Sequence, residues 1–393
     1  KTAYEIKECD WSSDVCSSDL NDFSAIIPIA VSAAQVVSQE LIGHIPSVTL
    51  YPSAERIAMG QNIVMPFVGV ASPSDWSPSM TLPSDNGETP TTQTLTVNYA
   101  KTHPILWTGN DELAAGTVGA SMLQNQFTQV FRAINNQIEA SIVAALKPAS
   151  SRARGTAGTV PFGNTKIDAP AWMAGVLDAN GAPGDRSLVL STAAAEGARQ
   201  HQNLTQVANA GTTDILNNGV IGNLAGMRVR TSGQNSSVTA GTGASYQINH
   251  SGGYVAGDTS LVLDTGTGTI LAGNVITIGN YSYVVKTALT SNVVVINEPG
   301  LMETVADNAA VTVAATYTPS FAYSRDAVIL ATRLPALNRL GDAAIFREVV
   351  TSPSSGISYE IAAYAGDHAI TFAVYALWGV KAVQPRHIAT LLG

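Results

Sequence analysis

The side chains that most often carry chemistry in proteins are scattered along this sequence. The histidines number six and lie far apart: His44, His103, His201, His250, His368 and His387. None stands at metal-ligand spacing from another histidine or from a carboxylate. The pairs Gly241–Gly243 and Gly266–Gly268 resemble parts of a dinucleotide-binding loop, but each lacks the third glycine and a following helix, so ordinary turns are favoured. We therefore expect no catalytic residue, no cofactor-binding residue and no metal ligand, and the sequence predicts a protein that is not an enzyme.

One basic cluster could contact a polyanion. Lys147, Arg152 and Arg154 follow the longest helical pattern of the chain. They could face nucleic acid, but we favour a simpler role, in which Lys147 complements the helix C-terminus beside a solvated loop. The chain has 20 basic and 29 acidic residues, and this acidic balance argues against a dedicated DNA-reading surface.

Residues 1–20 read, codon for codon, like a short-read sequencing adapter. We expect this segment to have no native structure and the natural protein to begin at or just before Asn21; the alternative is a genuine N-terminal arm. The segment contains the only cysteines, Cys9 and Cys16. The rest of the chain therefore has no disulfide framework, thiolate metal site or cysteine nucleophile. Without two lysines and five acidic residues of this segment, the remaining 373 residues carry a net charge of −6.

The low charge content predicts a protein that associates with itself. Charged residues make up 12% of the chain, against about 25% in typical soluble proteins. Interface cores are depleted in Lys, Glu and Asp, so extensive self-association explains the deficit; a secreted β-rich adhesin remains an alternative. The length suggests two or three domains. The apolar stretch 26–42 contains Gln35, Gln39 and Glu40, and we expect no membrane span.

The N-terminal part predicts a helix followed by a hairpin with a long connection. Residues 24–43 have helical periodicity, and residues 63–70 and 94–99 read as strands, the first demoted to an edge or bulged strand by Pro66. The connecting residues 71–93 are rich in Ser, Pro and Thr. Their large apolar side chains are Trp76, Met80 and Leu82. Such a stretch is either a passive loop or an arm ordered by a neighbouring subunit, for which these three residues would be the contacts.

The clearest element is a long amphipathic helix over residues 121–146. Its apolar residues repeat at intervals of three and four: Leu123, Phe127, Val130, Phe131, Ile134, Ile138, Ile142, Val143 and Leu146. We expect Leu123, Phe127, Phe131, Ile134 and Ile138 to form its core face. Ser121 and Gln124 fit a capping box, and Pro148 would end the helix.

A mixed region is followed by a β-rich one. Helices are expected over 172–177 and 192–208, and strands over 187–190 and 227–231. From about residue 235 to 316 the chain has one lysine or arginine, Lys286, and five short runs that read as strands: SLVLD, NVITIG, YSYVVK, NVVVIN and AVTVAAT. Gly279-Asn280 between two of these runs is a hairpin signal. Five short strands at this spacing predict a small inserted β-barrel or β-sandwich. A short helix is expected over 324–332, ended by Pro335, and a long strand buried on both faces over 370–383.

The order of these parts resembles the Hong-Kong-97-type capsid fold, an α+β fold with an N-arm, an extended E-loop, a spine helix, an A-domain and a P-domain. Three motifs resemble the P-twenty-two-type coat proteins of short-tailed phages. They are residues 62–66 with 72–76 at the entry to the E-loop, residues 321–329 re-entering the A-domain, and residues 376–380 with 384–386 at the C-terminal strand. The insertion is shorter and richer in Gly and Thr than that of the type member.

The resemblance implies a division of the chain. After the adapter-like residues 1–20 it runs as N-arm 21–60, E-loop hairpin 61–107, spine helix of the P-domain 108–150, first part of the A-domain 151–234, β-rich insertion domain 235–317, and A-domain return with the C-terminal P-domain strand 318–393.

The resemblance also implies a function. Copies would form hexamers and pentamers that tile an icosahedral shell around double-stranded DNA, contacted non-specifically, with a scaffolding protein and a portal as further partners. The protein would reside in the virion, and in the host cytoplasm during assembly. No cofactor and no cross-linking site are implied. The alternatives are an encapsulin-like cellular compartment and a secreted adhesin or tail protein.

Overall fold

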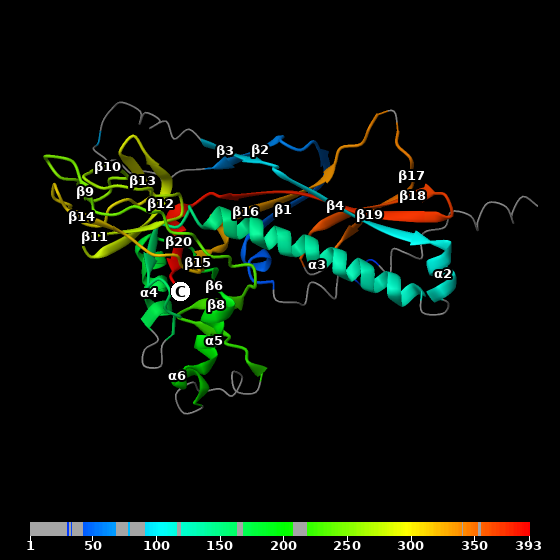
Figure 1. The fold of residues 1–393 in the computed structure, drawn as a ribbon, viewed down its shortest axis with the longest axis horizontal. Helices are drawn as coiled ribbons and strands as arrows, with labels where there is room; N and C mark the ends of the chain where they lie inside the picture. The colour runs from blue at the N-terminus through cyan, green and yellow to red at the C-terminus, as the bar shows by residue number, and fades with distance from the viewer. Residues whose placement is uncertain are drawn as a thin grey trace, which may run out of the picture.

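The computed structural model describes residues 30, 33, 42–67, 78, 91–115, 119–162, 168–206, 218–339, 341–352 and 355–393. The fold belongs to the α+β class: one long helix lies along a sheet, and a larger sheet continues into a β-rich unit (Figure 1). The adapter-like residues 1–20 lie outside the described part, as do Trp76, Met80 and Leu82. Of the helix expected over 24–43, Ala30 and Ala33 are described; both are helical and buried.

The long helix is present. Helix α3 (Gly119–Leu146) begins two residues before the expected start, so Ser121 lies in its first turn and not at its cap. The apolar stripe faces a six-stranded sheet, because period-3.6 spacing places these side chains on one side of the helix. The shorter helix α2 (Gly109–Ala115) precedes it.

The six-stranded sheet is built around the C-terminal strand β19 (Ala369–Ala382). Its order is β1–β16–β19–β18–β17, and β4 pairs with β19 as well. The other strands are β1 (Thr49–Ile57), β4 (Tyr99–Thr108), β16 (Val328–Pro335), β17 (Ala344–Thr351) and β18 (Ser358–Gly366). The middle of β19 is largely buried on both faces, as its continuous apolar sequence predicts.

The helix expected over 324–332 is wrong. Strand β15 (Ser320–Ser324) runs into a single 3-10 turn, Arg325–Ala327, and the chain then enters β16. Strand β16 pairs in parallel with β1 and antiparallel with β19, and most of its residues are buried. A strand that is apolar on both faces has no alternation, so its local pattern does not distinguish it from a buried helix.

A two-stranded ribbon stands apart from both sheets. It consists of β2 (Asn62–Phe67) and β3 (Thr91–Thr96), paired from Asn62↔Thr96 to Phe67↔Thr91. The strand expected over 94–99 is therefore divided, because β3 ends at Thr96 and β4 begins at Tyr99 and joins β19. Pro66 lies on an edge strand as predicted, and Pro52 of β1 and Pro104 of β4 also occupy edge strands. Proline donates no backbone hydrogen bond and is tolerated at such edges.

The larger sheet has twelve strands in the order β11–β14–β9–β10–β13–β12–β5–β20–β15–β6–β8–β7. Its remaining strands are β5 (Arg152–Arg154), β6 (Arg186–Leu190), β7 (Asn223–Leu224), β8 (Met227–Thr231) and β20 (Ile388–Leu391). Helices α4 (Asp168–Ala179), α5 (Thr192–Gln200) and α6 (Gln202–Thr205) belong to the same region. The strands expected over 187–190 and 227–231 are thus confirmed as β6 and β8.

The first six strands of that order close into a ring, because β11 also pairs with β12. The ring consists of β9 (Tyr246–Ile248), β10 (Ser260–Asp264), β11 (Val275–Ile278), β12 (Tyr281–Thr290), β13 (Val293–Ile296) and β14 (Ala310–Val313). Among the described residues, its main core cluster consists of its own side chains, including Leu261, Ile276 and Val294. Val275 and Val284 of the ring pack in a second cluster with Ala153 and Leu392. The pairing Ile278↔Tyr281 confirms the turn at Gly279-Asn280, where Gly279 has φ +59°.

Within the described part of the chain, no helix combines the length and hydropathy needed to cross a bilayer.

Candidate assembly site

The core face of α3 joins the helix to the sheet. Leu123, Phe127, Phe131, Ile134 and Ile138 are all buried in one cluster with residues of β18 and β19. The ring of Phe131 lies 4.8 Å from that of Tyr359 on β18, and Phe127 lies 6.0 Å from Phe372 on β19. These aromatic pairs hold the helix along the length of the sheet.

Polar contacts within this core determine how the helix sits on the sheet. The Tyr359 hydroxyl donates to Oδ1 of Asn135 at 2.7 Å, and Nε1 of Trp378 donates to Oγ of Ser141 at 2.9 Å. All four residues are buried, and burial raises the pKa of Tyr359 well above its usual range. Because each buried donor has one partner, a shift of the helix along the sheet would leave both donors unpaired.

A second buried network surrounds Glu139 of α3. One carboxylate oxygen accepts from the backbone N–H groups of His44, at 2.8 Å, and Ile45, at 2.6 Å. The other oxygen accepts from Oγ of Ser232 at 2.7 Å. The helix is thereby fixed to the segment preceding β1 and to the segment following β8.

The His44 ring extends this network. Nε2 donates to Oδ1 of Asn235 at 2.7 Å, and Nδ1 of the neutral ring accepts from the Tyr323 hydroxyl at 2.9 Å. Burial lowers the pKa of His44, although Glu139 and Asn235 act in the opposite direction. Burial, together with the Glu139 charge, raises the pKa of Tyr323 well above its usual value. The ring is therefore held neutral at the meeting point of four segments.

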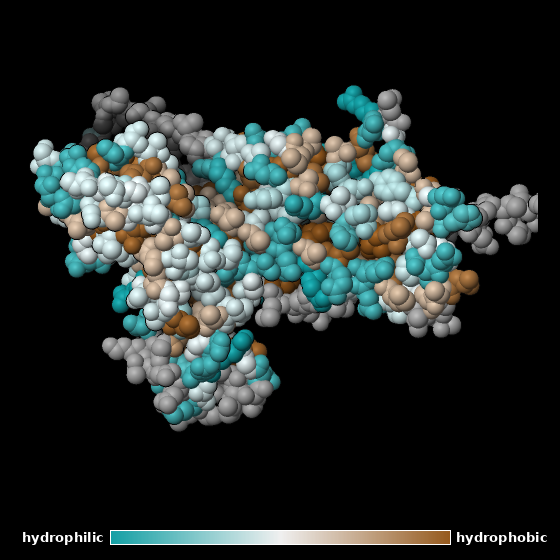
Figure 2. All heavy atoms as spheres, viewed as in Figure 1, coloured by the Kyte–Doolittle hydropathy of each residue, from teal (hydrophilic) through white to brown (hydrophobic). Residues whose placement is uncertain are grey.

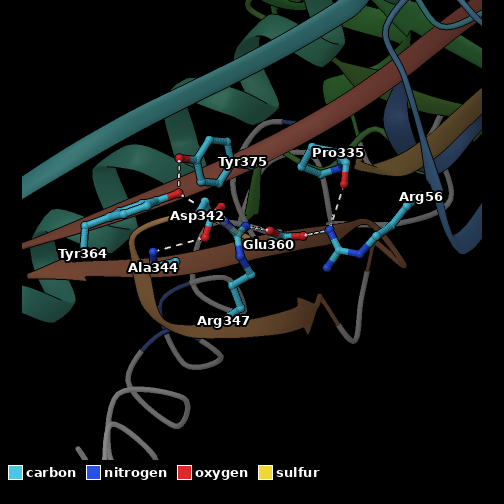
Figure 3. A network of polar contacts seen from close by, with 8 residues as sticks. All are labelled: Arg56, Pro335, Asp342, Ala344, Arg347, Glu360, Tyr364 and Tyr375. Carbon is cyan, nitrogen blue, oxygen red and sulfur yellow. Dashed lines mark hydrogen bonds and ion pairs between the residues drawn. The ribbon is translucent and has the colours of Figure 1, made fainter. Parts of the chain in front are cut away.

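A third network ties the strands of the six-stranded sheet together (Figure 3). Glu360 on β18 is 0% exposed, and its Oε2 accepts from Nη1 of Arg56 on β1 at 2.5 Å. Its Oε1 accepts from Arg347 on β17, which also pairs with Asp342. Nη1 of Arg56 donates in addition to the Pro335 carbonyl at 2.8 Å. Two guanidinium groups thus replace the hydration of one buried carboxylate.

Arg347 of this network and the neighbouring Tyr375 have shifted pKa values. Partial burial lowers the pKa of Arg347, but its bond and charge interaction with Glu360 outweigh burial, and the net change is upward. Burial and the hydrogen bond with Tyr364 raise the pKa of Tyr375 to about 12. Both groups therefore keep their protons across the physiological range.

The ribbon β2–β3 is attached at its base. Ile63 packs against Ile57, Val97 and Leu377, and Nζ of Lys381 on β19 donates to the Thr94 carbonyl at 2.8 Å. The alternate residues Asn62, Val64 and Pro66 of the ribbon are exposed, with Val64 60% accessible.

The residues that the sequence marked for chemistry are not brought together. His44 lies in the buried network, whereas His103, His250 and His368 are exposed on separate elements. In the part of the chain that the structure describes, no group of three or more His, Cys, Asp or Glu residues could hold a metal ion. Nζ of Lys147 donates to Oγ of Ser236 and to the Ser237 carbonyl, and so contacts the distant segment that precedes the β ring and not a helix carbonyl.

Sequence reasoning missed Glu139 and Glu360. Each is the only charged residue of its stretch, residues 133–146 and residues 349–366, and that isolation was the available signal of a buried charge. Their partners Ser232, Arg56 and Arg347 lie too far away along the chain to be inferred from spacing.

No family model matches the chain, and no curated protein matches it. Several solved structures resemble it at low identity. The capsid of an empty GTA particle has 11% identity and a TM-score of 0.48, with 90% of each chain covered. The capsid of cyanophage P-SCSP1u has 14% identity and a TM-score of 0.47, covering 88% of this chain and 86% of the other. A virus-like particle from Pyrococcus furiosus has 7% identity and a TM-score of 0.41, covering 93% and 99%.

Proposed function

We propose that this chain is a shell-building structural protein, the major capsid protein of a tailed bacteriophage. Copies would form hexamers and pentamers that tile an icosahedral shell around double-stranded DNA, in a Hong-Kong-97-type fold of the P-twenty-two branch with an inserted β domain. The observation that carries the proposal is the order of parts along the chain. Along the chain come a two-stranded ribbon, a long helix that packs on a sheet of long strands, a closed β ring and a buried C-terminal strand, in the order that the family resemblance implies.

The three family-like motifs lie at positions that support this reading. Residues 62–66 form most of strand β2 of the ribbon. Residues 321–329 lead from β15 through the 3-10 turn into β16, directly after the β ring. Residues 376–380 lie in the part of β19 that passes from β18 to β16.

Unpaired edges and exposed apolar groups provide surfaces for contact between copies. Among the described strands, β1, β4 and β17 each pair on one side only, as do both strands of the ribbon. Unpaired edges favour association with another chain. Figure 2 shows apolar side chains gathered between β4 and α3. Leu106 of β4 is 60% exposed and lines a shallow groove with Val130 and Ala133 of α3. Ile345 and Val349 on β17 are also exposed.

The proposed assembly also involves other partners and the connecting residues 71–93. A scaffolding protein and a portal would direct assembly in the host cytoplasm, and packaged DNA would be contacted without sequence specificity. Trp76, Met80 and Leu82 would be the contacts through which residues 71–93 bind a neighbouring subunit, since a buried aromatic anchor contributes much of the binding energy at an interface.

Electron microscopy and sedimentation of the recombinant chain from Asn21 onward test the proposal. We expect closed particles, alone or on co-expression with a scaffolding protein encoded by a neighbouring gene. A monomer under both conditions would contradict the proposal. Particles encoded beside cargo enzymes, without portal and terminase genes, would instead support the encapsulin-like alternative, and secretion without particles would support the adhesin.

A further inference from the structure

A cavity of about 600 Å³ lies where the β ring meets the rest of the twelve-stranded sheet. Its walls come from β5, the start of α4, the loop 155–162, the turn between β11 and β12, and the end of β20. The lining includes Phe162, Trp172 and Tyr281 beside two arginines, Arg152 and Arg154. None of these residues takes part in the three networks described above.

Among the described residues, Arg152 is a buried cation without a counter-ion. It is 6% exposed, and its Nε and Nη2 atoms have no hydrogen-bond partner among the described residues. The ion pairs found in the described part of the chain do not include it either. Burial lowers the pKa of Arg152, because desolvation disfavours the charged form. A buried guanidinium left in this state is unfavourable unless an anion compensates its charge.

Arg154 supplies a second positive charge to the same cavity. Residues two apart on a strand face the same side, so Arg152 and Arg154 lie on one face of β5. The guanidinium of Arg154 lies 5.6 Å from the centre of the Trp172 ring, and Asp168 approaches it at 3.9 Å between exposed side chains. Asp168 is the one acidic residue in the lining, so the described lining has an excess of one positive charge.

The cavity wall is also held in an unusual backbone conformation. Phe162 is buried and has φ +64°, a left-handed value that side chains other than glycine rarely adopt. Strained residues of this kind concentrate at binding sites, where the surrounding structure holds them in place.

We propose that this cavity binds a small phosphate-class oxyanion, with Arg152 as the principal ligand and Arg154 as the second cation. A guanidinium presents paired N–H donors that match the oxygens of a phosphate group. A bound anion would interact with β5 and α4 beside the turn that begins β12. It would thereby stabilise the connection between the β ring and the remainder of the sheet. The source is either free phosphate or the terminal phosphate of a nucleic-acid strand.

The test measures the thermal unfolding of the unassembled full chain while inorganic phosphate is titrated at constant ionic strength with chloride. We expect the melting temperature to rise with phosphate concentration, because a ligand that binds the folded state stabilises it. In Arg152→Met the apparent affinity should fall by at least about tenfold, while the melting temperature without phosphate stays equal or rises, because an unpaired buried cation has been removed. Arg339→Met, which removes an exposed arginine elsewhere, should respond like the wild-type chain.

Additional titrations identify the source of the phosphate, and a second variant keeps the test decisive if the first one does not fold. Stabilisation by a 5′-phosphorylated single-stranded oligonucleotide, but not by the unphosphorylated one, would assign the nucleic-acid source; stabilisation by inorganic phosphate alone would assign the free ion. If Arg152→Met does not fold, Arg154→Gln should weaken the phosphate effect. An absence of phosphate-dependent stabilisation, or an equal response of the Arg152 and Arg339 variants, would overturn the proposal whether or not the chain forms shells.

Discussion

Two buried carboxylates in this protein replace their hydration in different ways. Glu360 is paired with two arginines from two other strands of its sheet, β1 and β17, whereas Glu139 accepts hydrogen bonds from two backbone N–H groups and a serine hydroxyl. Removing one partner of a buried pair leaves an uncompensated charge, which is more costly than the pair is stabilising. Both sites should therefore be sensitive to substitution.

Glu360→Gln should strongly destabilise the fold. The substitution leaves Arg56 and Arg347 facing a neutral amide in a buried position, and we expect the free energy of unfolding to fall by about 3–5 kcal/mol. Urea denaturation measures this change. Glu348→Gln, at an exposed position of neighbouring strand β17, is the matched control and should stay within about 0.5 kcal/mol of wild type. Equal stability of the two variants would contradict a structural role for Glu360.

Phe131→Ala tests the core face of α3. Phe131 is fully buried against Tyr359 and Phe127, so truncation leaves a cavity and should cost about 3–5 kcal/mol. Gln137→Ala, on the exposed side of the same helix, should change stability by less than about 0.5 kcal/mol. Unchanged melting of Phe131→Ala would show that this face is not part of the core.

His44 should make stability depend on pH. Burial lowers its pKa in the folded protein below the ordinary value of 6.5. Above pH 6.5 both folded and unfolded chains hold the ring neutral, and the network with Tyr323, Asn235 and Glu139 is fully stabilising. Below that pH the unfolded chain binds a proton that the folded chain resists, so stability is lost as pH falls towards the folded pKa.

Chemical denaturation at a series of pH values measures this dependence. His44→Gln should be less stable at neutral pH and should show a shallower decline in acid, while His103→Gln, at an exposed position, should decline as the wild type does. Parallel curves for the wild type and the His44 variant would exclude His44 as the titrating group.

At the scale of elements, the β ring has the features of an independent unit. Its strands close on themselves, and its main core cluster, among the described residues, consists of its own side chains. Its ladder to the rest of the sheet consists of Ser282↔Ala153 and Tyr283↔Arg152. About 80 residues suffice for a marginally stable β domain.

We expect residues 235–317, expressed alone, to unfold cooperatively with a β-type circular dichroism spectrum. The expected stability is lower than in the full chain, because the pairing with β5 is lost. A random-coil spectrum would show that the ring depends on the remainder of the chain.

At the scale of the whole molecule, the networks around Glu139 and Glu360 connect segments from both ends of the sequence into one body. Arg56 contacts Glu360, and His44 contacts Tyr323. Under the proposed function, a subunit braced in this way would retain its shape when neighbouring subunits pull on it.

Replacing residues 72–91 by a two-residue turn tests the proposed arm. The base of the ribbon is held by Ile63 and by Lys381, so the shortened chain should remain folded and soluble. It should no longer form shells, because Trp76, Met80 and Leu82 would be lost. Trp76→Ala alone should weaken assembly less than the deletion. Normal particles from the deletion variant, seen by electron microscopy, would contradict an intersubunit arm.

The sequence by itself determined the elements whose signals are local. The three- and four-residue spacing from Leu123 to Leu146 defined α3, and Gly279-Asn280 between alternating runs defined a hairpin. Both depend on residues a few positions apart, which periodicity and turn chemistry describe well. Phe131 and its neighbours could be assigned to a core face for the same reason.

Only the tertiary structure decided the features that depend on distant partners. Residues 328–335 form a strand because β1 and β19 flank them, although their own pattern is equally compatible with a helix. The pairing of Arg56 and Arg347 with Glu360 and the isolation of Arg152 in its cavity follow from strand order, which local sequence does not encode. Burial of a charge is a property of everything packed around it, and that packing exists only once the chain has folded.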